Sequence, residues 1–291
     1  MNIGTWNVQS ISGKIEEITK ELEVLKMDIV TLTETERKGN GTELSNNYVH
    51  IYSGVAKHEK AKRGVSILIH KKHQNKITDF ESIDENIIKV NMNINQKSVT
   101  IFGVYAISDD EPYHKKDNFF GKLNEEITKI GNGRELIILS DFNGRVGRRT
   151  NHKVMGPHGE ITLNDNGERI IEICESHLLK VTNGFYKHKD IHKYTWPQPT
   201  SNLKSIIDYV INNSVEEIYA NIISSVHSAA EEALRLRAQV QSNNIWWNEE
   251  IDCLIKEKKN AYKKWLSSKQ QDRDTYLEIK RTTRQKIRIA K

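Results

Sequence analysis

The sequence predicts an α+β fold: a mixed α/β sandwich at residues 1–213, followed by a basic helical tail at residues 214–291. Short apolar runs rich in β-branched residues alternate with helical periodicity as far as residue 212. Several runs follow one another closely enough to pair as hairpins. A doubly wound parallel sheet is therefore not favoured, because in that fold a helix follows almost every strand. Beyond Asn213, apolar residues recur only at helical spacing.

The first half of the predicted domain contains five apolar runs and one helical stripe. Ile18 and Leu22 belong to that stripe, which predicts a helix over residues 13–26. The run at 88–94 alternates strictly between apolar and polar residues, as in a half-buried strand. A hairpin across residues 95–97 would join it to the next run. Strands are expected at residues 2–8, 28–34, 65–69, 88–94 and 98–107.

The second half begins with a helix marked by Phe119, Leu123 and Ile127. The most apolar strand of the chain is expected at residues 135–142. Asn166 is the expected N-cap of a further helix, because its side-chain oxygen can accept from the first turn. Turn residues predict loops. The last clear strand is expected at residues 205–211. Loops are expected at residues 38–41, 156–159 and 196–200.

The basic character of the chain is concentrated in its tail. Residues 245–291 hold 13 Lys and Arg against 7 Asp and Glu, whereas the other residues hold 31 basic and 32 acidic side chains. Such a segment suits contact with nucleic-acid phosphates, although a solvated helical linker explains it as well. The lysines expected to touch phosphates are Lys256, Lys258, Lys259, Lys263 and Lys264.

Several classes of protein are not expected from the composition. No run approaches the roughly 18 apolar residues of a membrane helix, so no membrane partner is expected. The first ten residues do not have the pattern of a secretory signal. The two cysteines, Cys174 and Cys253, fit buried side chains of a reduced protein. An intracellular location is expected, with the nucleus as one candidate, and the sequence gives no indication of oligomeric state.

Polar side chains follow the predicted strands at their ends. They are Asn7, Glu34, Tyr105, Asp141 and Asn143. Polar residues at the ends of buried strands converge on one rim of a sheet, where rigid strands hold them. Singly, each has a simpler interpretation, because strand-end carboxylates are often caps and a strand tyrosine is often in the core. Their combination favours a site.

The residue types suit attack of water on a phosphodiester. If Asp141 and Asn143 lie on one strand, their side chains share a face. The carboxylate can accept a proton from water, and the carboxamide can donate to an oxyanion. Glu34 and Asn7 supply the hard oxygen ligands that Mg²⁺ (or Mn²⁺) prefers. The sequence therefore predicts a metal-assisted phosphodiesterase site.

The motifs WNV, LTET, GVYA, DFNGRVG, YTW and IDYV occur in this order along residues 1–211. In this series the chain resembles the exonuclease–endonuclease–phosphatase superfamily. Within it, the chain is similar to the apurinic-endonuclease-like domains of non-LTR retrotransposons and their craniofacial-development-protein-2-like relatives. The resemblance implies a four-layer α/β-β/α sandwich and Mg²⁺-dependent nicking of DNA. The segment from about Ala229 to Lys291 resembles the linker that precedes the reverse transcriptase in such elements.

The resemblance also implies roles for individual residues. Asn7 and Glu34 would hold the metal site, and Tyr105 would contact or orient the scissile phosphate. Asp141 would position or deprotonate the attacking water, and Asn143 would stabilise the developing negative charge.

Three further residues take their expected roles from the same resemblance. Arg145 and Trp196 would face the nucleic acid, although core packing is an equal alternative for Trp196. Asp208 would orient a catalytic histidine.

That histidine is the departure from the family pattern. Family members continue to further strands that carry a Ser-Asp-His motif, and this chain contains no such motif. The last strands of the sandwich are therefore expected to be missing, with a bared strand edge. His227 is the only histidine after Asp208, and a helix-surface position explains it better. His188 and His192 have i, i+4 spacing, but a loop is expected there.

Four interpretations of function remain open from the sequence. The favoured one is a degenerate retrotransposon-type DNA endonuclease with weak or no activity, because the histidine is absent. The second is an active endonuclease that uses a substitute group. The third is a non-catalytic nucleic-acid-binding protein, and the fourth is a phosphoesterase acting on a small or lipid phosphate.

Overall fold

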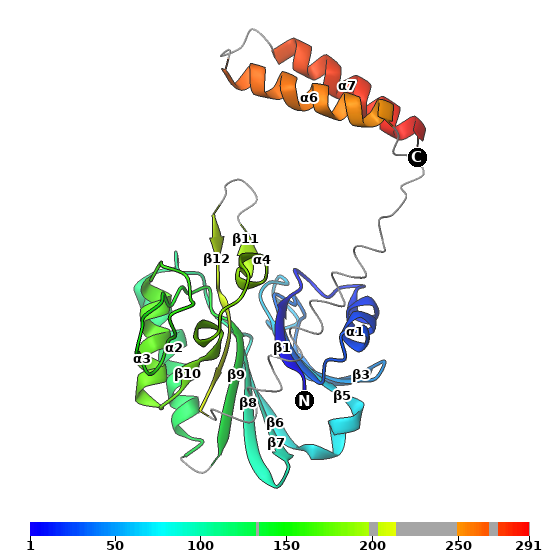
Figure 1. The fold of residues 1–291 in the computed structure, drawn as a ribbon. Coiled ribbons are helices and arrows are strands. Elements are labelled where there is room, and N and C mark those ends of the chain that lie inside the picture. The colour runs from blue at the N-terminus through cyan, green and yellow to red at the C-terminus, as the bar shows by residue number, and fades with distance from the viewer. Residues whose placement is uncertain (132–133, 198–202, 214–248, 268–272, 291) are drawn as a thin grey trace. The chain divides into compact units, whose positions relative to one another are not determined.

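Two β-sheets lie face to face in the computed structural model of the chain (Figure 1). The structure describes residues 1–131, 134–197, 203–213, 249–267 and 273–290. The first sheet has the strand order β1-β2-β5-β4-β3, and β1 and β2 run parallel. The strands are β1 (Ile3–Asn7), β2 (Ile29–Thr33), β3 (Asn40–Ser45), β4 (Tyr48–Ser53) and β5 (Val65–His70).

The second sheet has the order β10-β13-β9-β8-β7-β6, and β8 and β9 are its parallel pair. A separate two-stranded hairpin joins β11 to β12. The strands are β6 (Ile77–Asp84), β7 (Ile87–Ile94), β8 (Lys97–Tyr105), β9 (Glu135–Asp141), β10 (Lys180–Val181), β11 (Trp196–Pro197), β12 (Lys204–Ser205) and β13 (Asp208–Asn212).

Helices cover the outer face of each sheet. Leu22 of the first helix packs with Tyr48 and Leu68 on the first sheet. Phe119 and Phe120 of the second helix belong to the core that covers the second sheet. The helices of this part are α1 (Ile15–Val24), α2 (Tyr113–Thr128), α3 (Asp165–Ser176) and the short α4 (Asp190–Lys193), with 3₁₀ turns at Lys71–Lys76 and Thr182–Phe185.

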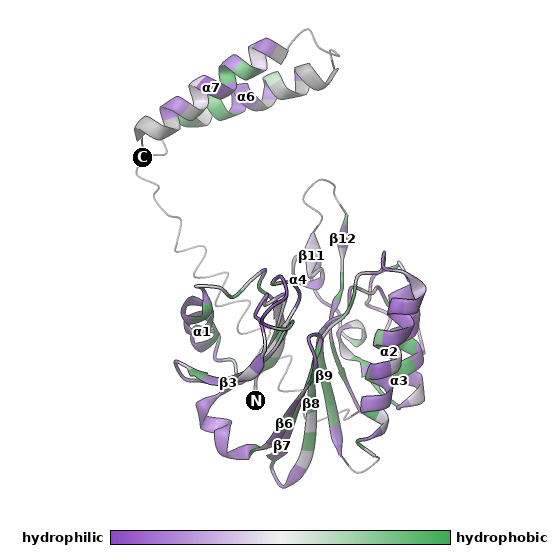
Figure 2. Ribbon diagram, turned by 180° about the vertical axis from the view of Figure 1, so that it is seen from behind, coloured by the Kyte–Doolittle hydropathy of each residue, from purple (hydrophilic) through white to green (hydrophobic). Residues whose placement is uncertain are grey.

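The core between the sheets comes from their inner faces. Ile67 of β5, Ile101 of β8 and Ile137 of β9 are fully buried there. Figure 2 shows apolar residues along β8 and β9, whereas α2 and α3 present many polar residues outward. The layer order is helix, sheet, sheet, helix, and the predicted four-layer sandwich is confirmed. In the described part of the chain, β1 is an edge strand of the first sheet.

The predicted hairpin between the two strands at 88–107 is confirmed. β7 and β8 pair antiparallel along their whole length, with Ile94 opposite Lys97. Asn95 and Gln96 form the turn with φ values of 51° and 64°. A two-residue turn with both φ positive matches the right-handed twist of the strands.

Some elements differ from the sequence prediction. β3 begins inside the expected loop at 38–41, and β4 and β6 were not predicted at all. β3 and β6 are the outermost strands of their sheets, and most of their residues are exposed or only partly buried. They therefore lack the continuous apolar run that identifies a central strand.

The N-cap of α3 is Asn164, so the expectation for Asn166 was wrong. The Asn164 side chain accepts from the backbone N–H of Gly167. Asn166 is fully buried, and its amide donates to the carbonyls of Ile107 and Phe142. It therefore ties α3 to the loops that follow β8 and β9.

The chain divides into two compact units, residues 1–232 and 233–291. The expected boundary between residues 213 and 214 falls where a described range ends, and His227 lies outside the described residues. The described residues of the second unit form α6 (Glu249–Ser267) and α7 (Arg273–Ala290). Lys286 pairs with Glu250 at 2.7 Å, and Thr283 is buried between the helices, where its hydroxyl donates to the carbonyls of Ile279 and Leu254. Within the described residues, no helix is long and apolar enough to cross a membrane.

Candidate active site

Four strands bring their C-terminal ends to one rim of the sandwich. In the first sheet Asn7 lies opposite Thr33, so Glu34 directly follows the paired position. In the second sheet Tyr105 lies opposite Asp141. Because both pairs are parallel, each places two consecutive strand ends side by side. The two sheets together collect the polar residues expected from the sequence.

Asn7 connects the two sheets at this rim. Its amide nitrogen donates to Glu34 Oε1 at 2.8 Å and to Asp141 Oδ2 at 3.1 Å. The Tyr105 hydroxyl donates to the same Glu34 oxygen at 3.3 Å. One carboxamide and one phenol thus hold two carboxylates in place across the interface of the sheets.

The backbone at Glu34 is held in an uncommon conformation. Its φ is 53° and that of Glu36 is 52°, in the left-handed region that non-glycine residues rarely adopt. Two bonds brace this turn: the N–H of Thr35 donates to the Gly64 carbonyl, and the N–H of Glu36 donates to the Arg63 carbonyl. Such strain persists only where surrounding contacts fix it, and it directs the Glu34 carboxylate toward Asn7 and Tyr105.

Asp141 is almost fully buried and lies directly opposite Asp208 in the β9–β13 pair. Burial raises the pKa of the Asp141 carboxyl, and the neighbouring charge of Asp208 raises it further. Hydrogen bonds from the backbone of Asn143 and from Asn7 oppose this rise. Asp141 is therefore a carboxyl group close to a second one, with donors that hold its orientation.

Asp208 has its Oδ1 atom buried without a hydrogen-bond partner among the described residues. Burial raises its pKa, a bond from Thr195 opposes the rise, and the charge of Glu34 adds to it. Thr195 was not predicted, although its hydroxyl also accepts from the backbone N–H groups of Ile207 and Asp208.

Asn143 does not reach the rim by strand alternation, as the sequence argument assumed. β9 ends at Asp141, and Asn143 follows it with a φ of 47°. Its amide nitrogen donates to the Ala106 carbonyl at 2.9 Å. One N–H of that amide stays available for a further acceptor, because a carboxamide carries two donors.

Tyr105 is a phenol that stays protonated. Burial raises its pKa, the charges of Glu34 and Asp141 raise it further, and Arg63 opposes the rise. A neutral hydroxyl beside two carboxylates can donate a hydrogen bond but does not act as a base at neutral pH.

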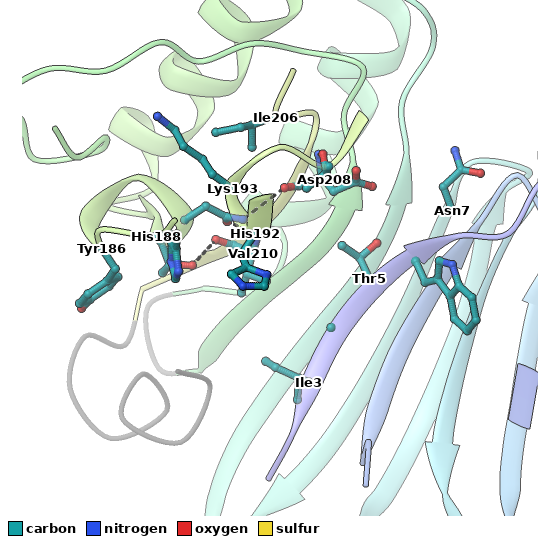
Figure 3. A pocket seen from close by; sticks show the side chains of 15 residues that line it. Ile3, Thr5, Asn7, Tyr186, His188, His192, Lys193, Ile206, Asp208 and Val210 are labelled. Carbon is teal, nitrogen blue, oxygen red and sulfur yellow. Dashed lines mark hydrogen bonds between the residues drawn. The ribbon is translucent and has the colours of Figure 1, made fainter. Parts of the chain in front are cut away.

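A cleft of about 460 Å³ runs from this rim along the free edge of β1. Asn7 and Asp208 lie toward one end of it, and Tyr186 and His188 toward the other (Figure 3). His192 also lines the cleft, so the sequence pair His188 and His192 faces one cavity although α4 is only four residues long.

The residues expected to bind nucleic acid lie in different places. Trp196 is 39% exposed on β11, which argues against core packing. Arg145 Nε lies 3.9 Å from Glu160 Oε2, and the Arg145 backbone bonds to Asn164. Lys258 is half-buried on α6. Lys259 and Lys263 belong to the same helix, but their side chains lie outside the described part.

The donor set at the rim suits a hard divalent cation. Glu34, Asp141 and Asp208 form no ion pair with Lys or Arg in the described part of the chain. Mg²⁺ is held by one or two carboxylates and keeps several waters, so Glu34 with the Asn7 carboxamide would suffice. Within the described residues, no cluster of three or more His, Cys, Asp and Glu side chains could hold a metal by itself. The fit therefore depends on oxygen ligands and bound water.

Comparison with solved structures agrees with this architecture. The catalytic domain of APE2 from Xenopus laevis superposes with a TM-score of 0.54 at 18% identity, covering 73% of this chain and 82% of that one. The AP endonuclease LMAP from Leishmania major gives 0.54 at 11% identity over 73% and 78%. The 3′-5′ exonuclease NExo from Neisseria meningitidis gives 0.52 at 18% over 73% and 86%. The chain has the exonuclease–endonuclease–phosphatase fold.

Two curated relatives are similar in sequence. Craniofacial development protein 2 from Bos taurus is 27% identical over 210 residues, which cover 72% of this chain and 35% of that protein. The same protein from Tragulus javanicus is 25% identical, with coverage of 72% and 36%. The chain thus spans about a third of the length of these relatives. No family model matches the chain.

Proposed function

We propose that the domain is a divalent-metal-dependent nuclease that hydrolyses phosphodiester bonds of DNA, with slow turnover. The observation that carries this proposal is the hydrogen-bonded group of Asn7, Glu34, Tyr105 and Asp141, drawn from both sheets. The fold supports it, because its solved neighbours include AP endonucleases and an exonuclease. NExo has been solved with a product DNA hairpin.

Each side chain has a task in this proposal. Asp141 accepts a proton from the attacking water, and Asn7 keeps its carboxylate oriented. Tyr105 donates a hydrogen bond toward a phosphate oxygen, and the second N–H of Asn143 donates toward the charge that develops. Glu34 and Asn7 hold Mg²⁺, which when bound would offset the negative charge of the phosphate and of the departing oxygen.

Slow turnover follows from Asp208. Its Oδ1 has no hydrogen-bond partner among the described residues, so no described histidine is held by Asp208 as the family pattern implies. A positioned acid–base group is worth about 10²–10⁴ in rate. We therefore place turnover at least about 100-fold below that of a nuclease that has a histidine at this position.

Nicking of supercoiled plasmid tests the proposal. The wild-type chain is expected to nick slowly with Mg²⁺ or Mn²⁺ and not in EDTA. Glu34→Gln and Asp141→Asn should abolish the nicking, because each removes a carboxylate of the site. Glu17→Gln, on the exposed face of α1, is the matched control. Nicking that survives both site substitutions would contradict the proposal.

A second candidate is a nucleic-acid-binding protein without catalysis. The Oδ1 atom of Asp208, which has no partner among the described residues, and the basic sequence of α6 and α7 favour it. Salt-sensitive DNA binding without any nicking at high protein concentration would support this candidate over the first.

The wider context of the protein is also a proposal. Retrotransposon ancestry rests on the motifs of residues 1–211 and on the similarity to the craniofacial development protein 2 sequences. An intracellular, nuclear location suits a DNA substrate.

A further inference from the structure

A cation stands at the edge of the candidate site that no sequence motif singled out. Arg63 lies in the loop between β4 and β5, and its carbonyl accepts from the N–H of Glu36 at 2.6 Å. The next carbonyl, of Gly64, accepts from Thr35 at 3.1 Å. Arg63 therefore lies against the turn that positions Glu34. Its φ of 56° is a left-handed conformation, held by these bonds.

The side chain of Arg63 is only loosely held. Its guanidinium lies 3.8 Å from Glu85 and 3.7 Å from Glu111, distances that permit attraction but exceed those of hydrogen bonds. By contrast, Arg37 makes two bonds of 2.6 and 2.7 Å to Glu43. The Arg63 side chain is also 29% exposed. Its N–H donors are therefore available to another acceptor.

The guanidinium lies 3.8 Å from Glu85, in the turn between β6 and β7 that bonds to the backbone of Tyr105. Glu85 immediately precedes Asn86, whose carbonyl accepts from the Tyr105 backbone. The Arg63 charge also acts on the phenol, since it opposes the rise of the Tyr105 pKa. Elsewhere the rim is acidic, with Glu34, Asp141 and Asp208. Lys193 lines the cleft together with Asp208, whereas Arg63 is the cation on the Tyr105 side of the rim.

We propose that Arg63 binds a DNA phosphate on the Tyr105 side of the site, exchanging its loose contacts with Glu85 and Glu111 for that phosphate. This inference rests on the proposed function, because it names a substrate-binding residue of the same site. A planar guanidinium can hold two oxygens of one phosphate at once.

Equilibrium binding to a short DNA duplex tests the inference without catalysis. Affinity is measured by fluorescence anisotropy in EDTA, between 50 and 200 mM salt. Arg63→Gln should weaken binding about fivefold at the lowest salt. It should also reduce the slope of log K against log salt by about 0.9, the value for one lost phosphate contact. Arg63→Lys keeps the charge but lacks the paired N–H donors of a guanidinium. Its affinity for DNA should lie between those of the wild type and Arg63→Gln.

Two controls separate a specific contact from general charge. Lys62→Gln removes the exposed neighbouring charge and should change the slope less than Arg63→Gln does. Glu111→Gln removes one of the two carboxylates that attract Arg63 and should therefore tighten DNA binding. The same substitution also removes the ion pair between Glu111 and Lys115. Unchanged affinity and slope in Arg63→Gln overturn the inference, and so does an equal loss in Lys62→Gln. A thermal melt of each variant confirms that it is folded.

The two proposals fail separately. If Asp141→Asn abolishes nicking while Arg63→Gln leaves DNA binding unchanged, the nuclease stands and the role of Arg63 does not. If Arg63→Gln weakens binding in a protein that never nicks DNA, the phosphate contact stands and the nuclease proposal fails.

Discussion

Replacing Asp208 by asparagine should stabilise the domain. The carboxylate lies in the second sheet with one oxygen buried and unpartnered, close to Asp141. A buried polar group without a partner costs about 1–3 kcal/mol, and more when it is charged. Asparagine keeps the shape and leaves a polar atom in place, but it removes the charge, which is the larger part of this cost. We therefore expect Asp208→Asn to raise the free energy of unfolding by about 1–3 kcal/mol near pH 8.

The same substitution should change the pH dependence of stability. The folded-state pKa of Asp208 is raised above its unfolded value, so the folded protein binds more protons in the window between the two. Its contribution is fully favourable below the unfolded pKa, and it is lost as pH rises through the folded pKa. Wild-type stability should thus fall with rising pH in this window, and Asp208→Asn should flatten the curve.

Thermal unfolding in EDTA from pH 5 to pH 8 measures both effects. For a domain of this size, 1 kcal/mol corresponds to about 2–4 °C in Tm. The increase in Tm of Asp208→Asn over the wild type should be largest at pH 8 and should shrink toward pH 5. Asp79→Asn, an exposed substitution on the edge strand β6, should change little at any pH. A Tm for Asp208→Asn at or below that of the wild type throughout would refute the reasoning.

Three further predictions concern the metal, a helix cap and the tail. Glu34→Ala should abolish Mg²⁺ or Mn²⁺ binding measured by calorimetric titration, because it removes the charged ligand; equal affinity in both proteins would contradict the assignment. Asn164→Ala should cost about 1 kcal/mol in a urea titration, since the first turn of α3 loses its cap, and no change in midpoint would argue against the cap. Replacing Lys256, Lys258 and Lys264 by glutamine should lower DNA affinity equally for all sequences and reduce its salt dependence, whereas unchanged binding at low salt would identify a solvated linker.

The central strands were predictable because burial dictates their composition. β2, β5 and β9 are buried over almost their whole length, and each is mainly apolar in the sequence. The outer strands were not predictable in this way. The sequence of β3 is mostly polar because the strand lies at the edge of its sheet. Its pairing with β4, which the sequence pattern does not reveal, makes it a strand.

The candidate site was predictable where its residues end buried strands. Asn7, Glu34, Tyr105 and Asp141 follow this rule, and the structure brings them within hydrogen-bonding distance of one another. Arg63 could not be predicted by this rule, because it does not end a buried strand. Backbone hydrogen bonds from Thr35 and Glu36, which are distant in sequence, place its segment at the site.

The polar role of Asn166 shows the same limit. Its position at the start of a helix suggested a cap, but tertiary bonds to two loops take its side chain into the core. Neither loop is adjacent to Asn166 in sequence. The local pattern therefore predicted Asn166 as the cap, whereas the cap is Asn164.

The bond between Asn7 and Asp141 joins positions 134 residues apart. Contacts of such long sequence separation close large loops and form slowly, because chain entropy must be lost before they contribute. Asp141 must also meet Asp208 from β13, so the rim cannot assemble until both sheets are complete and docked. If Glu34 and Asn7 hold the metal, a partly folded chain has no metal affinity. Recovery of metal binding during refolding would then report the last step of folding, and an emission probe such as Tb³⁺ could time that step.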